Sequence, residues 1–210
     1  MTEIIALSFL AALLSVDVTL FGQFMISRPI VCGPLIGYFL GDIKTGLWVG
    51  MLVDLIWIGN IPMGAAIPTD ATAVTVLSTI WGIIVFPGQR AGVVLALALA
   101  VIAGVLFKQV DIGMRYYNIR IVHWMENGVR KGNDSYINYS VYLGIALFIV
   151  KSFVFYVLLS YAGQWVLRKL FVHLTPHMMM GLSHAWYLLP LVGFGMVVVN
   201  FRYDKFPGLR

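Results

Sequence analysis

Two of the apolar runs in this sequence are too short to cross a membrane. The runs 29–41 and 46–59 hold 13 and 14 residues, whereas a helix needs about 20 residues at ~1.5 Å each to cross ~30 Å of hydrocarbon. Longer apolar runs surround this pair, at 4–21, 71–87, 91–107, 135–167 and 185–201. The pattern therefore predicts half-helices inside a larger helical array.

The composition places this array in a lipid bilayer. Apolar residues make up 60% of the chain, charged residues make up 11%, and the mean hydropathy is +0.91. Soluble domains carry charge on about a quarter of their residues, so a solvated enzyme, a disordered chain and a nucleic-acid-binding protein are excluded. We expect an all-α, polytopic transmembrane protein in which residues 1–210 form a single integral membrane domain.

Irregular chain adjoins the two short runs. Residues 41–46 join them, and the stretch 60–70 contains two prolines and follows the second run. Non-helical backbone survives at membrane depth only where protein or a wet cavity surrounds it, and interrupted hydrophobic segments are typical of transporter binding sites. The sequence predicts re-entrant half-helices and a binding region over about 22–71. The alternative is two short, steeply inserted helices with a polar turn outside the bilayer.

Glycines recur every four residues on both short runs. Gly33, Gly37 and Gly41 belong to the first run, and Gly46 and Gly50 to the second. Small residues at this spacing let helices approach closely. We expect these glycines to mark a helix-packing face.

The composition changes between Lys108 and Lys131, where seven charged residues follow long apolar runs. A helix here has an apolar face and a polar face, formed by Met114, Tyr117, Ile121 and Trp124 and by Arg120, His123, Asn127 and Arg130. The pattern predicts an amphipathic interfacial helix on the cytoplasmic side, over about 108–134. Its polar face is either solvated or a docking surface for a soluble partner.

The positive charges favour one orientation. With the segment 108–131 inside, the N-terminus lies outside and nine of the 14 basic residues are cytoplasmic. Arg168 and Lys169 then lie outside, and Lys151 lies within the membrane region. The run 135–167 is too long for one perpendicular crossing, so it must tilt, emerge or break near Lys151.

Acidic residues in or beside the apolar runs are candidates for a binding site. An ionised carboxylate at the membrane centre costs roughly 2.5–3.5 kcal/mol on insertion scales, so a guest or a partner must offset the cost. Asp54 either binds a ligand or forms a structural pair with Lys151 or Arg28. For Asp17 we expect a structural role.

A carboxylate accepts hydrogen bonds from vicinal hydroxyls, and an amide both donates and accepts them. Such groups suit a polyol, and Asp70 is in addition a plausible helix N-cap. The residues predicted to bind a neutral sugar are Asp54, Asp70, Asn60, Thr69 and Gln23. Trp57 or Trp81 either faces the sugar ring or packs inside the protein.

Metal, cofactor and nucleotide chemistry lack support in the sequence. The four histidines show no recognisable ligand spacing with cysteine or a third partner, and there is no glycine-rich phosphate loop. We expect no metal and no cofactor, and energy for any transport must come from another protein.

Several segments carry a family resemblance: Ser27–Ile30, Gly37–Gly46, Gly50–Asp54, Met63–Asp70, Pro176–Gly181 and Leu189–Met196. Together they resemble the membrane IIC subunit of the mannose/fructose/sorbose family of the bacterial phosphoenolpyruvate-dependent sugar phosphotransferase system (PTS). The resemblance covers about residues 1–203. In this alignment Asp54 stands where family members typically have Glu, and Asp70 matches the family's Asp after the Gly-Ala-Ala run.

The resemblance implies a multi-pass protein of the bacterial inner membrane that forms a hetero-oligomer. A IID membrane subunit would share the binding of a hexose or amino sugar. Soluble IIA/IIB subunits would phosphorylate the sugar at the cytoplasmic face from a histidine outside this chain, so no catalytic or phosphoryl-carrying residue is expected here.

Two other functions stay open. Family members typically continue through further hydrophobic segments, so this chain is alternatively a non-transporting regulatory or assembly subunit derived from such a permease. A third hypothesis is a membrane protein that binds a vitamin-like ligand and is driven by an external ATPase.

Overall fold

The computed structural model describes residues 2–19, 22, 24–59 and 69–205. Within these ranges the chain forms seven helices and no strand, which confirms the all-α prediction. The helices are α1 (Thr2–Thr19), α2 (Pro29–Phe39), α3 (Ile43–Ile56), α4 (Ala71–Val85), α5 (Arg90–Arg130), α6 (Ser135–Val172) and α7 (Pro176–Lys205). Three of them, α5, α6 and α7, are long and apolar enough to cross a membrane.

The two short helices form a hairpin with a defined turn. Pro29 begins α2, where its missing N–H costs nothing. Gly41 has a positive φ of 81° in the turn, and the Asp42 carboxylate then caps α3 by accepting hydrogen bonds from the Thr45 N–H at 3.0 Å and hydroxyl at 2.6 Å. The predicted half-helices are therefore present, and their depth in the bilayer stays a prediction.

The glycine ladder packs α2 directly against α3. A Cβ atom on Gly33 would lie 2.4 Å from the carbonyl oxygen of Gly46, and one on Gly50 would lie 2.2 Å from that of Pro29. The two backbones are thus closer than any side chain allows. The expected packing face is confirmed for Gly33, Gly37, Gly46 and Gly50, and its partner is the neighbouring short helix. For Gly41 the prediction is wrong, because Gly41 lies in the turn and nothing lies within 4 Å of its Cβ position.

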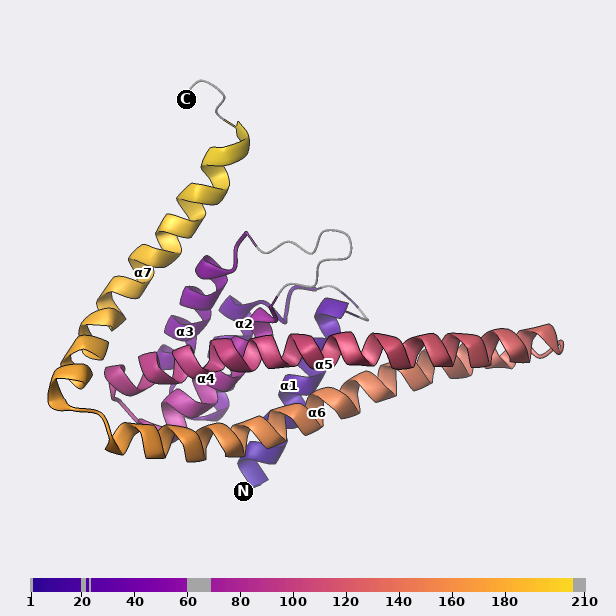
Figure 1. Cartoon of the computed structure of the whole chain (residues 1–210), viewed down its shortest axis with the longest axis horizontal. Helices are drawn as coiled ribbons and strands as arrows, with labels where there is room; N and C mark the ends of the chain where they lie inside the picture. The colour runs from indigo at the N-terminus through magenta and orange to yellow at the C-terminus, as the bar shows by residue number, and fades with distance from the viewer. Residues whose placement is uncertain (1, 20–21, 23, 60–68, 206–210) are drawn as a thin grey trace.

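Helix α4 lies at the centre of the molecule (Figure 1) and contacts α1, α2, α3, α5 and α6. Every residue from Thr72 to Gly82 is buried. The Thr75 and Ser78 hydroxyls are satisfied within the helix, because they donate to the carbonyls of Ala71 and Val74 at 2.8 and 2.6 Å. A helix of only 15 residues is thus enclosed by protein.

Helices α5 and α6 form a long hairpin that extends beyond the other helices (Figure 1). Their 41 and 38 residues correspond to about 60 Å of helix, twice the hydrocarbon thickness. The segment 108–130 is helical as predicted, but it continues α5 without a break. Its apolar face contacts α6, where the rings of Trp124 and Tyr136 lie 4.7 Å apart. Helix α6 likewise passes Lys151 without a break.

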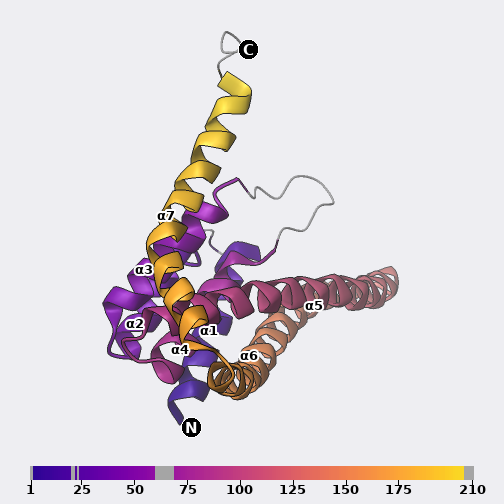
Figure 2. The same ribbon diagram turned by 60° about the vertical axis from the view of Figure 1, so that its left-hand side comes forward.

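Helix α7 rises beside α3 and away from the hairpin (Figure 2). The indole rings of Trp48 in α3 and Trp186 in α7 stack with their centroids 3.6 Å apart. The Arg90 guanidinium at the start of α5 donates a hydrogen bond to the Tyr187 hydroxyl. Only 6% of the most apolar window of α7 is buried within this chain, so lipid or another protein must cover the rest.

The close contact between α2 and α3 predicts that one added methyl group at Gly46 lowers the stability of the protein. Gly46→Ala should lower the free energy of unfolding by about 1–3 kcal/mol, because the new Cβ would lie 2.4 Å from the Gly33 carbonyl oxygen. Gly144→Ala is the matched control, since nothing lies within 4 Å of its Cβ position. Unfolding in detergent measures both, and equal stability of the two variants would contradict the close packing.

Candidate functional site

Asp70 begins α4 at the point where the irregular stretch 60–70 ends. Its carboxylate Oδ1 accepts a hydrogen bond from the Ala73 N–H at 2.8 Å, which confirms the predicted N-cap. The Thr72 hydroxyl donates to the Ser27 carbonyl at 2.9 Å and so fixes this end of α4 to the chain that precedes α2. Capping uses one oxygen, and a carboxylate has acceptor sites for further hydrogen bonds.

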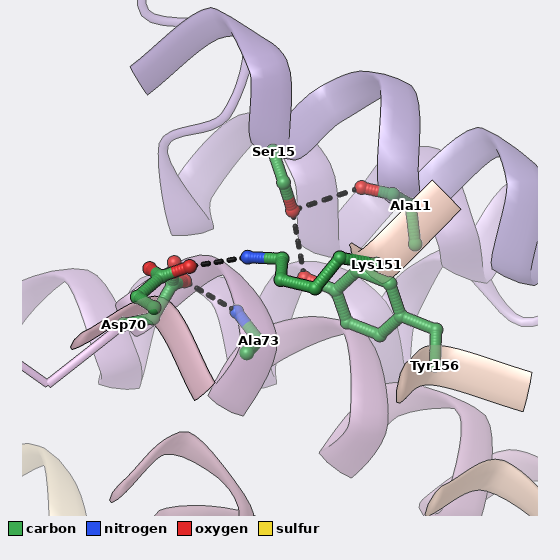
Figure 3. A network of polar contacts seen from close by, with 7 residues as sticks. Ala11, Ser15, Asp70, Ala73, Lys151 and Tyr156 are labelled. Carbon is green, nitrogen blue, oxygen red and sulfur yellow. Dashed lines mark hydrogen bonds and ion pairs between the residues drawn. The ribbon is translucent and has the colours of Figure 1, made fainter. Parts of the chain in front are cut away.

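A partly buried ion pair acts electrostatically on Asp70. The Lys151 ammonium in α6 binds the Asp111 carboxylate in α5, and the two side chains are 10% and 19% exposed. Lys151 also lies 4.2 Å from the ring centroids of both Phe107 and Phe148. Lys151 and Asp111 both act electrostatically on Asp70, and Figure 3 shows the Lys151 ammonium on the side of the Asp70 carboxylate. The ion pair itself joins Lys151 to Asp111.

The Lys151–Asp111 ion pair excludes one of the two structural partners predicted for Asp54. The pair Asp54–Lys151 is not formed, because Lys151 binds Asp111. Arg28, just before α2, is the basic residue that acts electrostatically on Asp54. Asp54 is partly buried on α3 and remains a candidate for ligand binding.

Cys32 connects the two predicted carboxylates in space. Its buried thiol on α2 is within electrostatic range of both Asp70 and Asp54. The two acids, 16 residues apart in the sequence, thus both act electrostatically on one buried thiol of α2. That they bind one ligand together stays a prediction.

Two hydroxyl groups, those of Ser15 and Tyr156, form a contact near Asp70. The Ser15 hydroxyl on α1 donates to the Ala11 carbonyl at 3.0 Å and lies 2.8 Å from the Tyr156 hydroxyl on α6 (Figure 3). Tyr156 is fully buried and is within electrostatic range of Asp70, Cys32 and Asp111. The contact fixes α1 to α6 beside the acidic groups.

The other residues predicted to bind the sugar are Asn60, Gln23 and Thr69. Asn60 and Gln23 lie outside the described residues. Thr69 is partly buried, and its methyl group lies against Gly104 of α5.

Trp81 and Trp57 have different environments. The Trp81 indole N–H donates to the Ser160 carbonyl at 3.2 Å, and its ring covers Gly163, so Trp81 packs α4 against α6. The Trp57 Nε1 atom, one turn after Asp54, is buried without a hydrogen-bond partner among the described residues. Such a donor needs a polar partner, which makes Trp57 a candidate for the site.

Asp17 has the structural role that we expected. Its carboxylate accepts hydrogen bonds from the Phe24 N–H at 2.8 Å and from the Ser27 N–H and hydroxyl at 3.3 and 3.1 Å. It thereby fixes the chain between α1 and α2. Among the described residues no group of three or more His, Cys, Asp or Glu side chains could hold a metal ion.

Three groups near Asp70 were not in the predicted set, namely Asp111, Lys151 and Tyr156. Asp111 was grouped with the charged segment 108–131. A hairpin with its turn near 131–134 would have suggested its partner, because Asp111 and Lys151 lie at similar distances before and after that turn. Tyr156 shows no distinguishing signal in the sequence, since it is one aromatic residue in a long apolar run.

Comparison with known proteins decides the family. The family described as "PTS system sorbose-specific iic component" matches residues 1–202. The chain belongs to this family. The PTS IIC resemblance of the sequence is thereby confirmed, and the protein is a membrane permease subunit of the sugar PTS.

Individual relatives share part of the sequence. The mannose-specific EIIC component of Escherichia coli K12 is 26% identical over 199 residues, which cover 94% of this chain and 73% of that protein. The fructose permease IIC component of Bacillus subtilis is 30% identical over 131 residues, which cover 62% of this chain and 47% of that protein.

Two solved structures share the fold. A structure described as a membrane protein has a TM-score of 0.75 at 23% identity, and the match covers 98% of this chain and 82% of that one. The mannose transporter ManYZ in complex with microcin E492 has a TM-score of 0.67 at 24% identity, with 97% and 81% covered. These likenesses support the helical architecture of the IIC family.

The ion pair gives a prediction about stability. Lys151→Met should lower the free energy of unfolding by about 3 kcal/mol, because it leaves the Asp111 carboxylate buried without its counter-ion. The double variant Lys151→Met with Asp111→Leu should recover most of this loss, since both charges are then removed. Lys131→Met, at an exposed position, serves as the control. A double variant no more stable than Lys151→Met would show that the pair is not coupled.

Proposed function

We propose that this PTS IIC chain binds and translocates a hexose or an amino sugar, and that Asp54 and Asp70 hold the sugar hydroxyls. Membership of the family supports the sugar class. The observation that supports the site is that both carboxylates act electrostatically on the buried Cys32 thiol of α2. This place adjoins the ends of the short helices, where transporters of broken-helix type bind their substrates.

The chemistry of the surrounding groups suits a polyol. Each carboxylate accepts hydrogen bonds from sugar hydroxyls, and the buried Trp57 N–H supplies a donor one turn from Asp54. Asn60, Gln23 and Thr69 complete the proposed set. Because Asp is one methylene shorter than the Glu of typical family members, the sugar must approach α3 more closely here.

The proposal includes partners. A IID membrane subunit completes the sugar site, and soluble IIA/IIB subunits phosphorylate the sugar at the cytoplasmic face of a bacterial inner membrane. The likeness to the mannose transporter ManYZ supports a two-subunit assembly. The apolar surface of α7, which this chain leaves almost uncovered, offers area for such a partner.

Asp54→Asn tests the role of the carboxylate. Uptake of labelled hexose should fall by about 10-fold or more, because a hydrogen bond to a charged group contributes roughly 1.5–3 kcal/mol. Asp54→Glu should keep uptake, and Glu126→Gln, an exposed acid on α5, is the matched control. Uptake and phosphorylated product are measured in cells that express the partner subunits, at equal membrane levels of each variant. If Asp54→Asn transports normally, Asp54 is structural at most.

The only cysteine of the chain reports on the same site. Cys32 is fully buried, so a maleimide should modify it only when the region around Asp54 and Asp70 opens. Bound sugar should slow this modification, because the sugar occupies the space between the two carboxylates. The measurement is the rate of maleimide labelling with and without sugar, and Asp54→Asn should lose the protection. A rate that does not depend on sugar in the wild-type assembly would place the sugar elsewhere.

A further inference from the structure

The second half of α6 exposes one continuous face. Its exposed residues recur at intervals of three and four, which places them on the same side of the helix. This outer stripe consists of Val150, Val154, Leu158, Tyr161 and Trp165. It is apolar over about four turns, and the same face then continues with the exposed residues Arg168 and Lys169.

A hollow of about 600 Å³ lies at the basic end of the outer stripe. Arg168, Lys169 and His173 are among the residues that line it, and Trp165 adds an aromatic side chain. The Lys169 ammonium lies 3.9 Å from the centroid of the Trp165 ring, so a cation–π contact helps to hold it there.

The charge of this hollow is not neutralised by neighbouring acids. No Asp or Glu is among the described residues that line it, and the sequence from Ser135 to Tyr203 contains no acidic residue at all. Gln164, which is 8% exposed, also lines the hollow. An anion that enters this space meets at least two permanent positive charges and no carboxylate of α6.

We propose that this hollow binds the phosphate of an anionic phospholipid headgroup, whose acyl chains lie along the outer stripe. Arg and Lys are the usual donors to phosphate oxygens. Trp and Tyr prefer the boundary between headgroups and hydrocarbon, and basic pockets beside transmembrane helices bind anionic headgroups. The basic end would thus contact the phosphate, Trp165 would lie at the boundary, and the apolar stripe would contact the acyl chains.

A free phosphate ion shares the headgroup chemistry but does not explain the stripe. The hollow is lined in part by Val172, which is 80% exposed, and by Trp165 of the outer stripe. A small, fully hydrated anion gains nothing from this apolar surface. A lipid occupies both parts at once, and we therefore assign the site to a lipid.

The test measures lipid contact at Trp165. The full chain is reconstituted in bilayers that contain brominated phosphatidylglycerol or brominated phosphatidylcholine, which quench tryptophan fluorescence on contact. The signal of Trp165 is the difference between the wild-type protein and Trp165→Phe. We expect phosphatidylglycerol to quench Trp165 at a much lower mole fraction than phosphatidylcholine does.

Charge variants decide the role of the basic residues. Arg168→Gln with Lys169→Gln should reduce the preference for phosphatidylglycerol by about 30-fold, since each basic residue near an anionic surface contributes roughly a factor of five. Arg130→Gln with Lys131→Gln removes the same charge from the turn of the hairpin and should leave the preference at Trp165 unchanged.

Three results would overturn the proposal. Equal quenching by the two lipids would show that the basic end does not select the headgroup. Absence of quenching by either lipid would show that protein covers the stripe. Loss of the preference upon addition of millimolar inorganic phosphate, at constant ionic strength, would assign the hollow to a free anion.

Discussion

This structure depends on the free-energy cost of leaving polar groups without hydrogen-bond partners in an apolar environment. Helix α4 is too short to cross a bilayer, and its backbone ends must therefore find partners inside the protein. Asp70 caps its first turn, and Thr72 attaches that turn to the chain before α2. Five helices then enclose α4, so the polar groups near its N-terminus lie within protein. A binding site for hydroxyls needs such an enclosed polar place.

The same free-energy cost explains why the charged side chains between the long helices are paired. Lys151 and Asp111 compensate one another between two long helices, and their neighbour Asp70 shares the field of the one ammonium. Ion pairs of this kind add little net stability compared with apolar residues. The Lys151 ammonium also acts electrostatically on Asp70, so it partly balances the charge of a carboxylate that we propose to bind the sugar. At the far end of α6 the basic residues have no such acids nearby and face outward.

Close packing and the sugar site depend on each other through α2. The glycines of α2 and α3 bring the two backbones together, and this contact carries Asp54 to the side of α2 on which Cys32 lies. Larger residues at these positions would separate the two helices and shift Asp54 relative to α2. The glycine ladder therefore positions one carboxylate of the proposed site.

The sequence by itself determined the local features, namely the half-helices, the cap at Asp70, the glycine face and the structural role of Asp17. These depend on residues within a few positions of one another, or on run lengths set by the bilayer. The tertiary structure decided that α5 continues past Lys108, that Lys151 binds Asp111 and not Asp54, and that Tyr156 meets Ser15. Each of these depends on the register and crossing of helices far apart in the chain, and such contacts arise from packing that no local pattern encodes.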